Sequence, residues 1–141
     1  MKFLVIVKAS EESEAGAIPS TEALTAMGKF NEELSRAGIM LAAEGVRPSS
    51  KGARVKFEGN KRTVIDGPFA ETKELVAGFW IWQLKSMDEA IEWAKRIPNP
   101  TGDMGVVEIR QIQEPDDFGE NMTPELKEQE RRIAAQVSQR K

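Results

Sequence analysis

The pattern of apolar and polar positions predicts a four-stranded sheet. Residues 3–7 and the run Phe79-Trp80-Ile81-Trp82 are apolar at consecutive positions, so both faces of these two strands need cover from water. Such strands belong in the middle of a sheet. The strands that the pattern predicts are residues 3–7, 39–43, 75–84 and 106–112.

Two segments have apolar positions at helical spacing. The first follows a surface loop at residues 10–19, begins near Ser20, a favourable N-cap, and ends at Gly38. The second opens with Ser86-Met87-Asp88-Glu89, which matches the S-x-x-E capping box, and ends at Pro98. The apolar positions expected to face the sheet are Ala23, Met27, Phe30, Leu34 and Ala37 in the first helix, and Met87, Ala90, Ile91 and Ala94 in the second.

Polar and apolar residues alternate between the second and third predicted strands. This alternation predicts a β-hairpin with one solvent-exposed face. Its strands are residues 54–58 and 61–65, joined by the two-residue turn Gly59-Asn60. After the last core strand, residues 114–121 form an acidic linker. A terminal helix then begins at Thr123-Pro124-Glu125, with few apolar residues.

The order of these elements is that of an α+β fold. It corresponds to a ferredoxin-like βαββαβ unit with an inserted β-hairpin, followed by a C-terminal helix. We expect one domain over residues 1–118 and a helical tail over residues 119–141.

The segment Asp66-Gly67-Pro68-Phe69 joins the hairpin to the apolar third core strand. Glycine before proline predicts a sharp turn, and Pro68 is well placed to begin a short helical turn. The carboxylate of Asp66 suits the start of this turn, because it can accept hydrogen bonds from backbone N–H groups two or three residues on. Asp66 is therefore either a structural cap or a functional acid.

This segment and several others resemble the DGPF proteins of the YCII-related family. The resembling stretches, in chain order, are residues 26–34, 42–49, 66–74, Gly78-Phe79-Trp80 and residues 107–111. The resemblance implies a ferredoxin-like subunit that pairs into a dimeric α+β barrel. It also implies an association with lyase or dehydrochlorinase chemistry on aromatic substrates, carried by a paired histidine and aspartate. This chain has no histidine, so only Asp66 matches that pair.

Composition narrows the function. A net charge of −3 and scattered lysines and arginines indicate no nucleic-acid interface. The absence of histidine and cysteine indicates no metal site and no disulfide, and we expect no cofactor. No apolar run approaches the length of a membrane span or a signal peptide, which indicates a cytoplasmic location.

Proton transfer would therefore fall to a carboxylate or a lysine. The candidate catalytic residue is Asp66, and the candidate substrate-binding residues are Glu44, Arg47, Phe69 and Lys73. The alternative for Glu71, Lys73 and Glu74 is a solvated turn, and the tryptophans at 80 and 82 are typical of a core or a dimer interface.

Three functions remain open from the sequence. The chain is a small-molecule binding protein with a pocket near Asp66, or a cofactor-free lyase or isomerase that uses Asp66 as acid or base. The third is a regulatory partner, because the resemblance implies an association with extracytoplasmic-function sigma factors. In each case we expect a homodimer, since two helices can cover only one face of the central strands.

Overall fold

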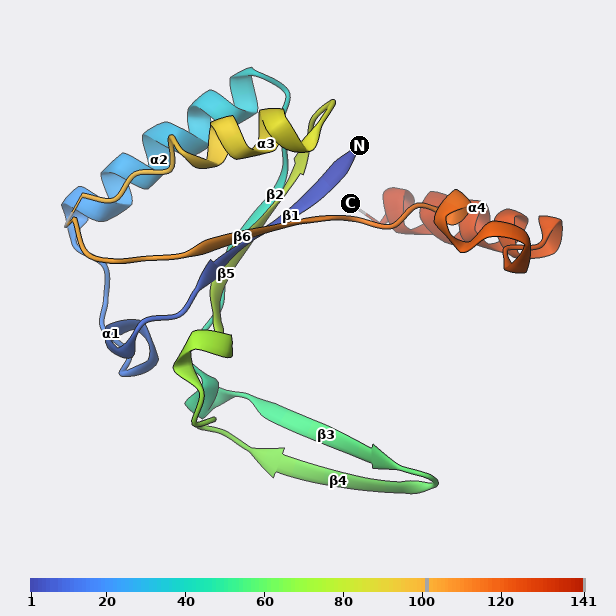
Figure 1. The fold of residues 1–141 in the computed structure, drawn as a ribbon, viewed down its shortest axis with the longest axis horizontal. Coiled ribbons are helices and arrows are strands. Elements are labelled where there is room, and N and C mark those ends of the chain that lie inside the picture. The colour runs from blue at the N-terminus through green and yellow to red at the C-terminus, as the bar shows by residue number, and fades with distance from the viewer. Residues whose placement is uncertain (101, 141) are drawn as a thin grey trace. The chain divides into compact units, whose positions relative to one another are not determined.

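β1 and β5 occupy the centre of a four-stranded antiparallel sheet (Figure 1). The structure is a computed structural model and describes residues 1–100 and 102–140. The sheet order β2-β5-β1-β6 is the strand order of a ferredoxin-like βαββαβ unit, so the expected α+β topology is confirmed. The four strands are β1 (Lys2–Lys8), β2 (Met40–Gly45), β5 (Val76–Gln83) and β6 (Val107–Gln111).

One face of this sheet packs against two helices and forms the core. α2 (Thr21–Arg36) and α3 (Met87–Ala94) lie on the same side of the sheet in Figure 1. Strand register places Val5 beside Trp80, and both are buried. Trp82 is also buried on this face, so the two tryptophans are core residues. The core cluster consists of Val5, Phe30, Leu34, Ile39, Trp80 and Trp82.

The helix starts follow the sequence closely, but the end and the inner face of α3 differ from the expectation. Ser20 accepts a hydrogen bond from the Ala23 N–H (3.1 Å), and Ser86 accepts one from the Glu89 N–H (3.2 Å). α3 ends at Ala94, earlier than expected, and Met87 and Ile91 are exposed instead of facing the core. The ring of Trp93 packs against the core in their place, because its centroid lies 6.5 Å from that of Phe30.

The second face of the sheet is not covered by a helix within the described part of residues 1–111. Leu4 and Ile6 of β1 and Phe79 and Ile81 of β5 lie on this face, and each is partly exposed. We call this surface the open face. Its apolar character agrees with the expectation that both faces of the central strands require cover.

β3 (Ala53–Glu58) and β4 (Lys61–Asp66) form a separate two-stranded sheet with the expected Gly59-Asn60 turn. We call residues 53–66 the arm, because they project from the end of the four-stranded sheet in Figure 1. One solvent-exposed face was expected, but within the described structure both faces are exposed and only Thr63 is partly buried. The arm has too few neighbours in its own chain to cover either face.

Several short helices replace segments that were expected to be irregular. α1 (Glu11–Glu14) lies in the expected surface loop, where Ser10 and Ser13 form a capping box. The expected helical turn at Pro68 is displaced: Pro68 follows a cis bond, and the 3₁₀ turn begins four residues later. The 3₁₀ segments are η1 (Ser49–Lys51), η2 (Thr72–Glu74) and η3 (Pro115–Asn121).

The chain divides into two compact units, Met1–Gln111 and Ile112–Lys141. In the second unit, η3 occupies the expected acidic linker and leads to α4 (Pro124–Gln139). Thr123 caps this helix by accepting a hydrogen bond from the Leu126 N–H (3.2 Å), as the sequence predicts. None of the helices within the described residues has both the length and the apolar character that a membrane span requires.

Candidate functional site

A cavity of about 360 Å³ lies between α2 and the helix-covered face of the sheet. Two small residues opposite each other, Gly45 of β2 and Gly78 of β5, line it together with Val7. Trp80 and Ala43, the next residues on this face, also line it. The remaining lining residues are Pro19, Met27, Asn31, Glu44, Ala77 and Phe79.

The two paired glycines line the cavity without side chains. A Cβ on Gly78 would lie 3.0 Å from the Glu44 carbonyl oxygen, so this position is closed to larger residues by the backbone of β2. A Cβ on Gly45 would meet only the Ala77 carbonyl oxygen, at 4.0 Å. Gly45 can therefore be enlarged without a clash, and such a side chain would occupy space beside the cavity.

Asn31 provides polar hydrogen-bonding atoms at the cavity. The indole N–H of Trp80 donates to Asn31 Oδ1 over 2.8 Å. Because an indole nitrogen can only donate, this bond orients the amide with its oxygen toward Trp80. The Asn31 NH₂ group has no hydrogen-bond partner within the described residues and is available to an acceptor on a bound molecule.

Glu44 is the only ionisable residue among those that line the cavity. Its side chain is exposed, and no ion pair joins it to a cation within the described residues. Of the residues predicted as a site from the sequence, Glu44 is the one that borders this cavity, but it pairs with Phe79, so its side chain lies on the open face and its backbone borders the cavity.

Asp66 lies apart from this cavity, at the exposed end of β4, where it pairs in register with Ala53. The expected cap by its carboxylate does not form within the described structure. The Gly67 N–H donates instead to the Gly52 carbonyl oxygen (3.0 Å), and the Phe69 N–H donates to Ser49 Oγ (3.0 Å). These two N–H groups of the turn therefore donate to Ser49 of η1 and to Gly52, the residue after η1. The Asp66 carboxylate remains exposed to solvent.

The turn after the arm is held by Ser49 and Glu14. The Ser49 N–H donates to Glu14 Oε2 (3.0 Å), and the Ser49 hydroxyl donates to Glu14 Oε1. Gly67 is required here because a Cβ would lie 1.7 Å from the Ser49 carbonyl oxygen. This arrangement connects α1, η1 and the turn into one structural cluster.

The other predicted site residues are distributed around the root of the arm. The guanidinium of Arg54 stacks on the ring of Phe69, with its carbon 3.8 Å from the ring centroid. Arg47 is exposed in the connection after β2. Lys73 lines a different, open hollow at η2. The structure therefore does not bring Arg47, Phe69 and Lys73 together with Glu44 in one pocket.

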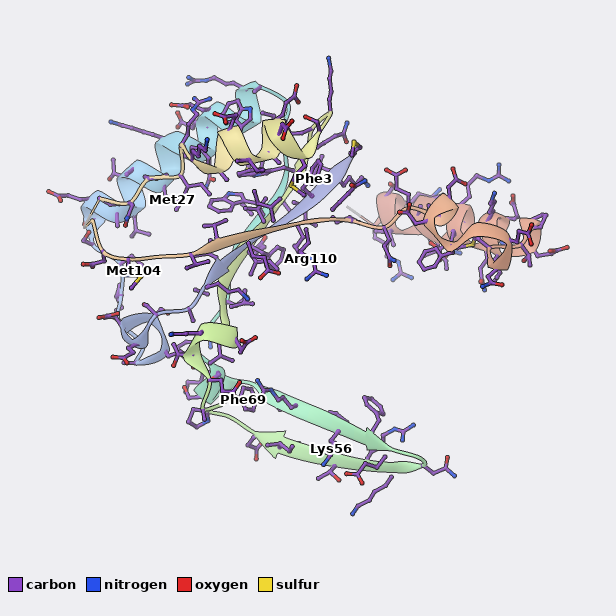
Figure 2. All side chains as sticks on the ribbon, viewed as in Figure 1. Phe3, Met27, Lys56, Phe69, Met104 and Arg110 are labelled. Atoms are coloured by element: carbon purple, nitrogen blue, oxygen red, sulfur yellow. The ribbon has the colours of Figure 1, made fainter. Side chains whose placement is uncertain are left out.

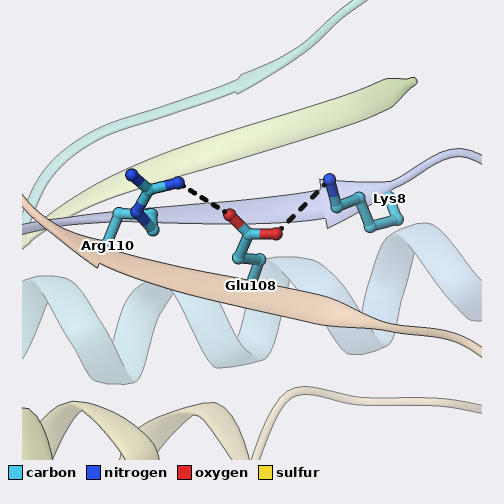
Figure 3. Close-up of polar contacts among 3 residues, drawn as sticks. All are labelled: Lys8, Glu108 and Arg110. Atoms are coloured by element: carbon cyan, nitrogen blue, oxygen red, sulfur yellow. Dashed lines mark hydrogen bonds and ion pairs between the residues drawn. The ribbon is translucent and has the colours of Figure 1, made fainter. Parts of the chain in front are cut away.

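A charged cluster lies on the open face at the β1–β6 edge. Glu108 Oε1 is 3.5 Å from Lys8 Nζ, and Glu108 Oε2 accepts a hydrogen bond from Arg110 (3.3 Å) (Figure 3). The hydrogen bond from Arg110, followed by the positive charge of Lys8, lowers the pKa of the Glu108 carboxyl below its usual value. Glu108 is thus held ionised by two cations and is suited to a structural role.

Sequence reasoning missed Asn31, Gly45, Ser49 and Glu14. Asn31 lies within residues 26–34, and Gly45 and Ser49 lie within residues 42–49. Both stretches carried the resemblance, which was the available signal. Ser49 and Glu14 are 35 positions apart, and no local pattern connects them.

Comparisons with known proteins identify the family of residues 1–116, which match the model of the YCII-related domain. An uncharacterised protein of Rhizobium meliloti (strain 1021) is 35% identical over 65 residues, which is 46% of this chain and 52% of that protein. The match thus spans about half the length of this curated relative.

A solved structure of 5-chloro-2-hydroxyhydroquinone dehydrochlorinase from Burkholderia phenoliruptrix AC1100, in complex with 2,5-dihydroxybenzoquinone, is 18% identical. It covers 81% of this chain and 96% of its own chain, with a TM-score of 0.41.

Proposed function

The chain belongs to the YCII-related domain family, and we propose that it binds a small molecule with an apolar body in the cavity between α2 and the sheet. The observation that carries this proposal is the pairing of Gly45 with Gly78 against the side chain of Trp80. A volume of about 360 Å³ lies in the range of small-molecule sites, and its walls are mainly apolar.

One polar side chain defines the chemistry of the ligand. The Asn31 NH₂ group donates to an acceptor oxygen of the ligand. Trp80 offers the aromatic surface of the site. A hydroxylated aromatic compound combines an apolar ring with an acceptor oxygen.

The proposal is tested by binding of a panel of hydroxylated monocyclic aromatics, measured by two-dimensional NMR and by fluorescence of the tryptophans. We expect binding to shift the resonances of Asn31, Gly45 and Trp80. Gly45→Val should abolish these shifts, because the new side chain occupies space beside the cavity without a backbone clash. Gly105→Val is the matched control, since a Cβ there meets nothing within 4 Å and Gly105 does not line the cavity.

Two substitutions separate the proposed contact of Asn31 with the ligand from its hydrogen bond to Trp80. Asn31→Asp keeps an oxygen that accepts from the indole but removes the NH₂ donors, so it should weaken binding by roughly tenfold with little loss of stability. Asn31→Ala removes both contacts and should also cost about 1–3 kcal/mol of unfolding free energy, by leaving the buried indole N–H unpaired. Shifts that persist in the Gly45→Val protein, or no binding by any compound of the panel, would contradict the proposal.

Binding is favoured over catalysis by Asp66, because Asp66 is exposed and does not line the cavity. The side chain of Glu44, the ionisable residue that borders the cavity, lies on the open face, so it does not supply a proton-transferring group there. Turnover of a bound aromatic would contradict a role in binding alone.

We propose that the protein acts as a homodimer that covers the open face. β2 and β6 are the two edge strands, and the antiparallel pairings across the sheet make them run in opposite directions. A second copy related by a two-fold axis parallel to the strands would therefore bring β2 of one copy beside β6 of the other in antiparallel orientation. The apolar residues of the open face support this arrangement.

A further inference from the structure

Within the described residues of its own unit, the arm is left exposed on both faces. Strand register places Val55 opposite Val64 and Phe57 opposite Arg62, so these residues share one face of the arm. The exposed fractions are 50% for Val55, 66% for Val64 and 68% for Phe57. An isolated two-stranded hairpin is marginally stable in water, so an arm with this apolar face requires a partner surface.

The arm also carries a charge opposite to that of the rest of the chain. Residues 53–66 contain four cations and two carboxylates, a net charge of +2, whereas the whole chain has −3. The other residues therefore carry −5. Arg62 lies on the apolar face itself, with its guanidinium carbon 4.5 Å from the centroid of the Phe57 ring. The arm thus matches an acidic surface that has some apolar area.

Such a surface lies at the end of the sheet from which the arm departs. Glu11, Glu71 and Glu74, with Lys73, line an open hollow of about 520 Å³ together with Ala9, Ser10 and Thr72. The Ala9 N–H donates to the Leu75 carbonyl oxygen (2.9 Å), which joins this hollow to the beginning of β5. Figure 2 places Phe69 at the root of the arm and Lys56 farther along it, away from the sheet. The arm of a chain therefore points away from its own acidic end.

We propose that the arm of each copy docks, through Val55, Phe57 and Val64, on the acidic end of the sheet in a second copy. This inference rests on the proposed homodimer. A two-fold axis parallel to the strands brings the same ends of the two sheets together, so the root of one arm lies near the acidic end of the partner. Each six-residue strand extends about 20 Å, which is enough to cross a neighbouring domain face. Opposite charges favour docking on a second copy over docking on an unrelated acidic protein, because the chain itself carries an acidic surface that complements the basic arm.

The first test measures the dimer dissociation constant of the full chain by sedimentation. Phe57→Ser should raise this constant at least roughly tenfold, because it removes the largest apolar contact of the arm. Leu24→Ser is the matched control, since Leu24 is 59% exposed on α2, and it should change the constant less than about twofold. Far-UV circular dichroism and the fluorescence of Trp80 and Trp82 report whether each variant is folded.

A charge exchange tests the acidic partner surface. Arg62→Glu and Glu74→Arg should each weaken the homodimer, and an equimolar mixture of the two should restore association. In the mixed dimer one arm contact pairs the two substituted residues with their charges exchanged, and the other keeps Arg62 opposite Glu74. Lys29→Glu, which makes the same change of charge on α2 as Arg62→Glu, should not weaken association. If the mixture associates no more tightly than either variant alone, the assignment of the acidic end as the docking surface is overturned.

Hydrogen exchange tests the docking of the arm separately from the open-face dimer and from ligand binding. The amides of β3 and β4 should be protected at concentrations where the protein is dimeric, and they should exchange rapidly after dilution to the monomer. An arm that exchanges rapidly in the dimer, or a Phe57→Ser protein that dimerises like the Leu24→Ser control, would overturn the inference and leave the open-face dimer intact. Ligand shifts at Gly45 test the proposed function separately.

Discussion

Ser49 binds both carboxylate oxygens of Glu14, one through its backbone N–H and the other through its hydroxyl. Its hydroxyl oxygen also accepts a hydrogen bond from the Phe69 N–H (3.0 Å). A single side chain therefore connects α1, η1 and the turn that follows the arm. This cluster fixes the direction in which the arm leaves the sheet.

Replacement of Ser49 should destabilise the protein. Ser49→Ala leaves the Phe69 N–H and one Glu14 oxygen without their partner, and we expect a loss of about 1–2 kcal/mol of unfolding free energy. Urea denaturation measures this loss. Ser50→Ala is the control, because Ser50 is exposed and its hydroxyl has no partner within the described residues, and it should change stability by less than about 0.5 kcal/mol. Equal effects of the two substitutions would show that the Glu14–Ser49 contact is not needed for the turn.

Replacement of Asp66 should have little effect. Its carboxylate is exposed and accepts no hydrogen bond within the described structure, so Asp66→Asn and Asp66→Ala should each change the unfolding free energy by less than about 0.5 kcal/mol. Thermal and urea unfolding of the three proteins provide the measurement. A loss of more than about 1 kcal/mol in Asp66→Ala alone would restore the turn-cap interpretation.

The stability of the protein should depend on Glu108 in acid. The pKa of the Glu108 carboxyl is lowered by the hydrogen bond from Arg110 and then by the charge of Lys8. This contribution is present above the pKa of the unfolded chain and is lost as the pH falls through the lower pKa of the folded state. Unfolding free energies measured between about pH 5 and pH 3 should therefore fall more steeply for the wild type than for Glu108→Gln. Parallel curves for the two proteins would contradict this role.

The open face should hold the two subunits together. Sedimentation at micromolar concentration should give twice the chain mass of 15.7 kDa. Ile81→Lys places a charge in the middle of the open face, beside Leu4 in register, and should give a folded monomer. Leu24→Lys on α2 serves as the control and should remain dimeric. A wild type that sediments as a monomer would remove the basis for both the dimer and the docking of the arm.

The sequence by itself determined the secondary structure of the core and its topology. Consecutive apolar residues identified β1 and β5 as the central strands. A central strand is buried on both faces, so its side chains are apolar at consecutive positions and do not alternate with polar ones. Ser20, Ser86 and Thr123 marked the helix starts, since capping depends on residues three positions apart. The Gly59-Asn60 turn fixed the register of the hairpin for the same local reason.

Only the tertiary structure decided which residues share a site. Asp66 and Phe69 stand in the most distinctive segment of the sequence, but the donors of that turn are bound by Ser49 and Gly52, which lie in another segment. The cavity depends on Gly45 and Gly78 lying opposite each other, which follows from the pairing of β2 with β5. Such contacts join positions far apart in the chain, so no local pattern of residue types records them.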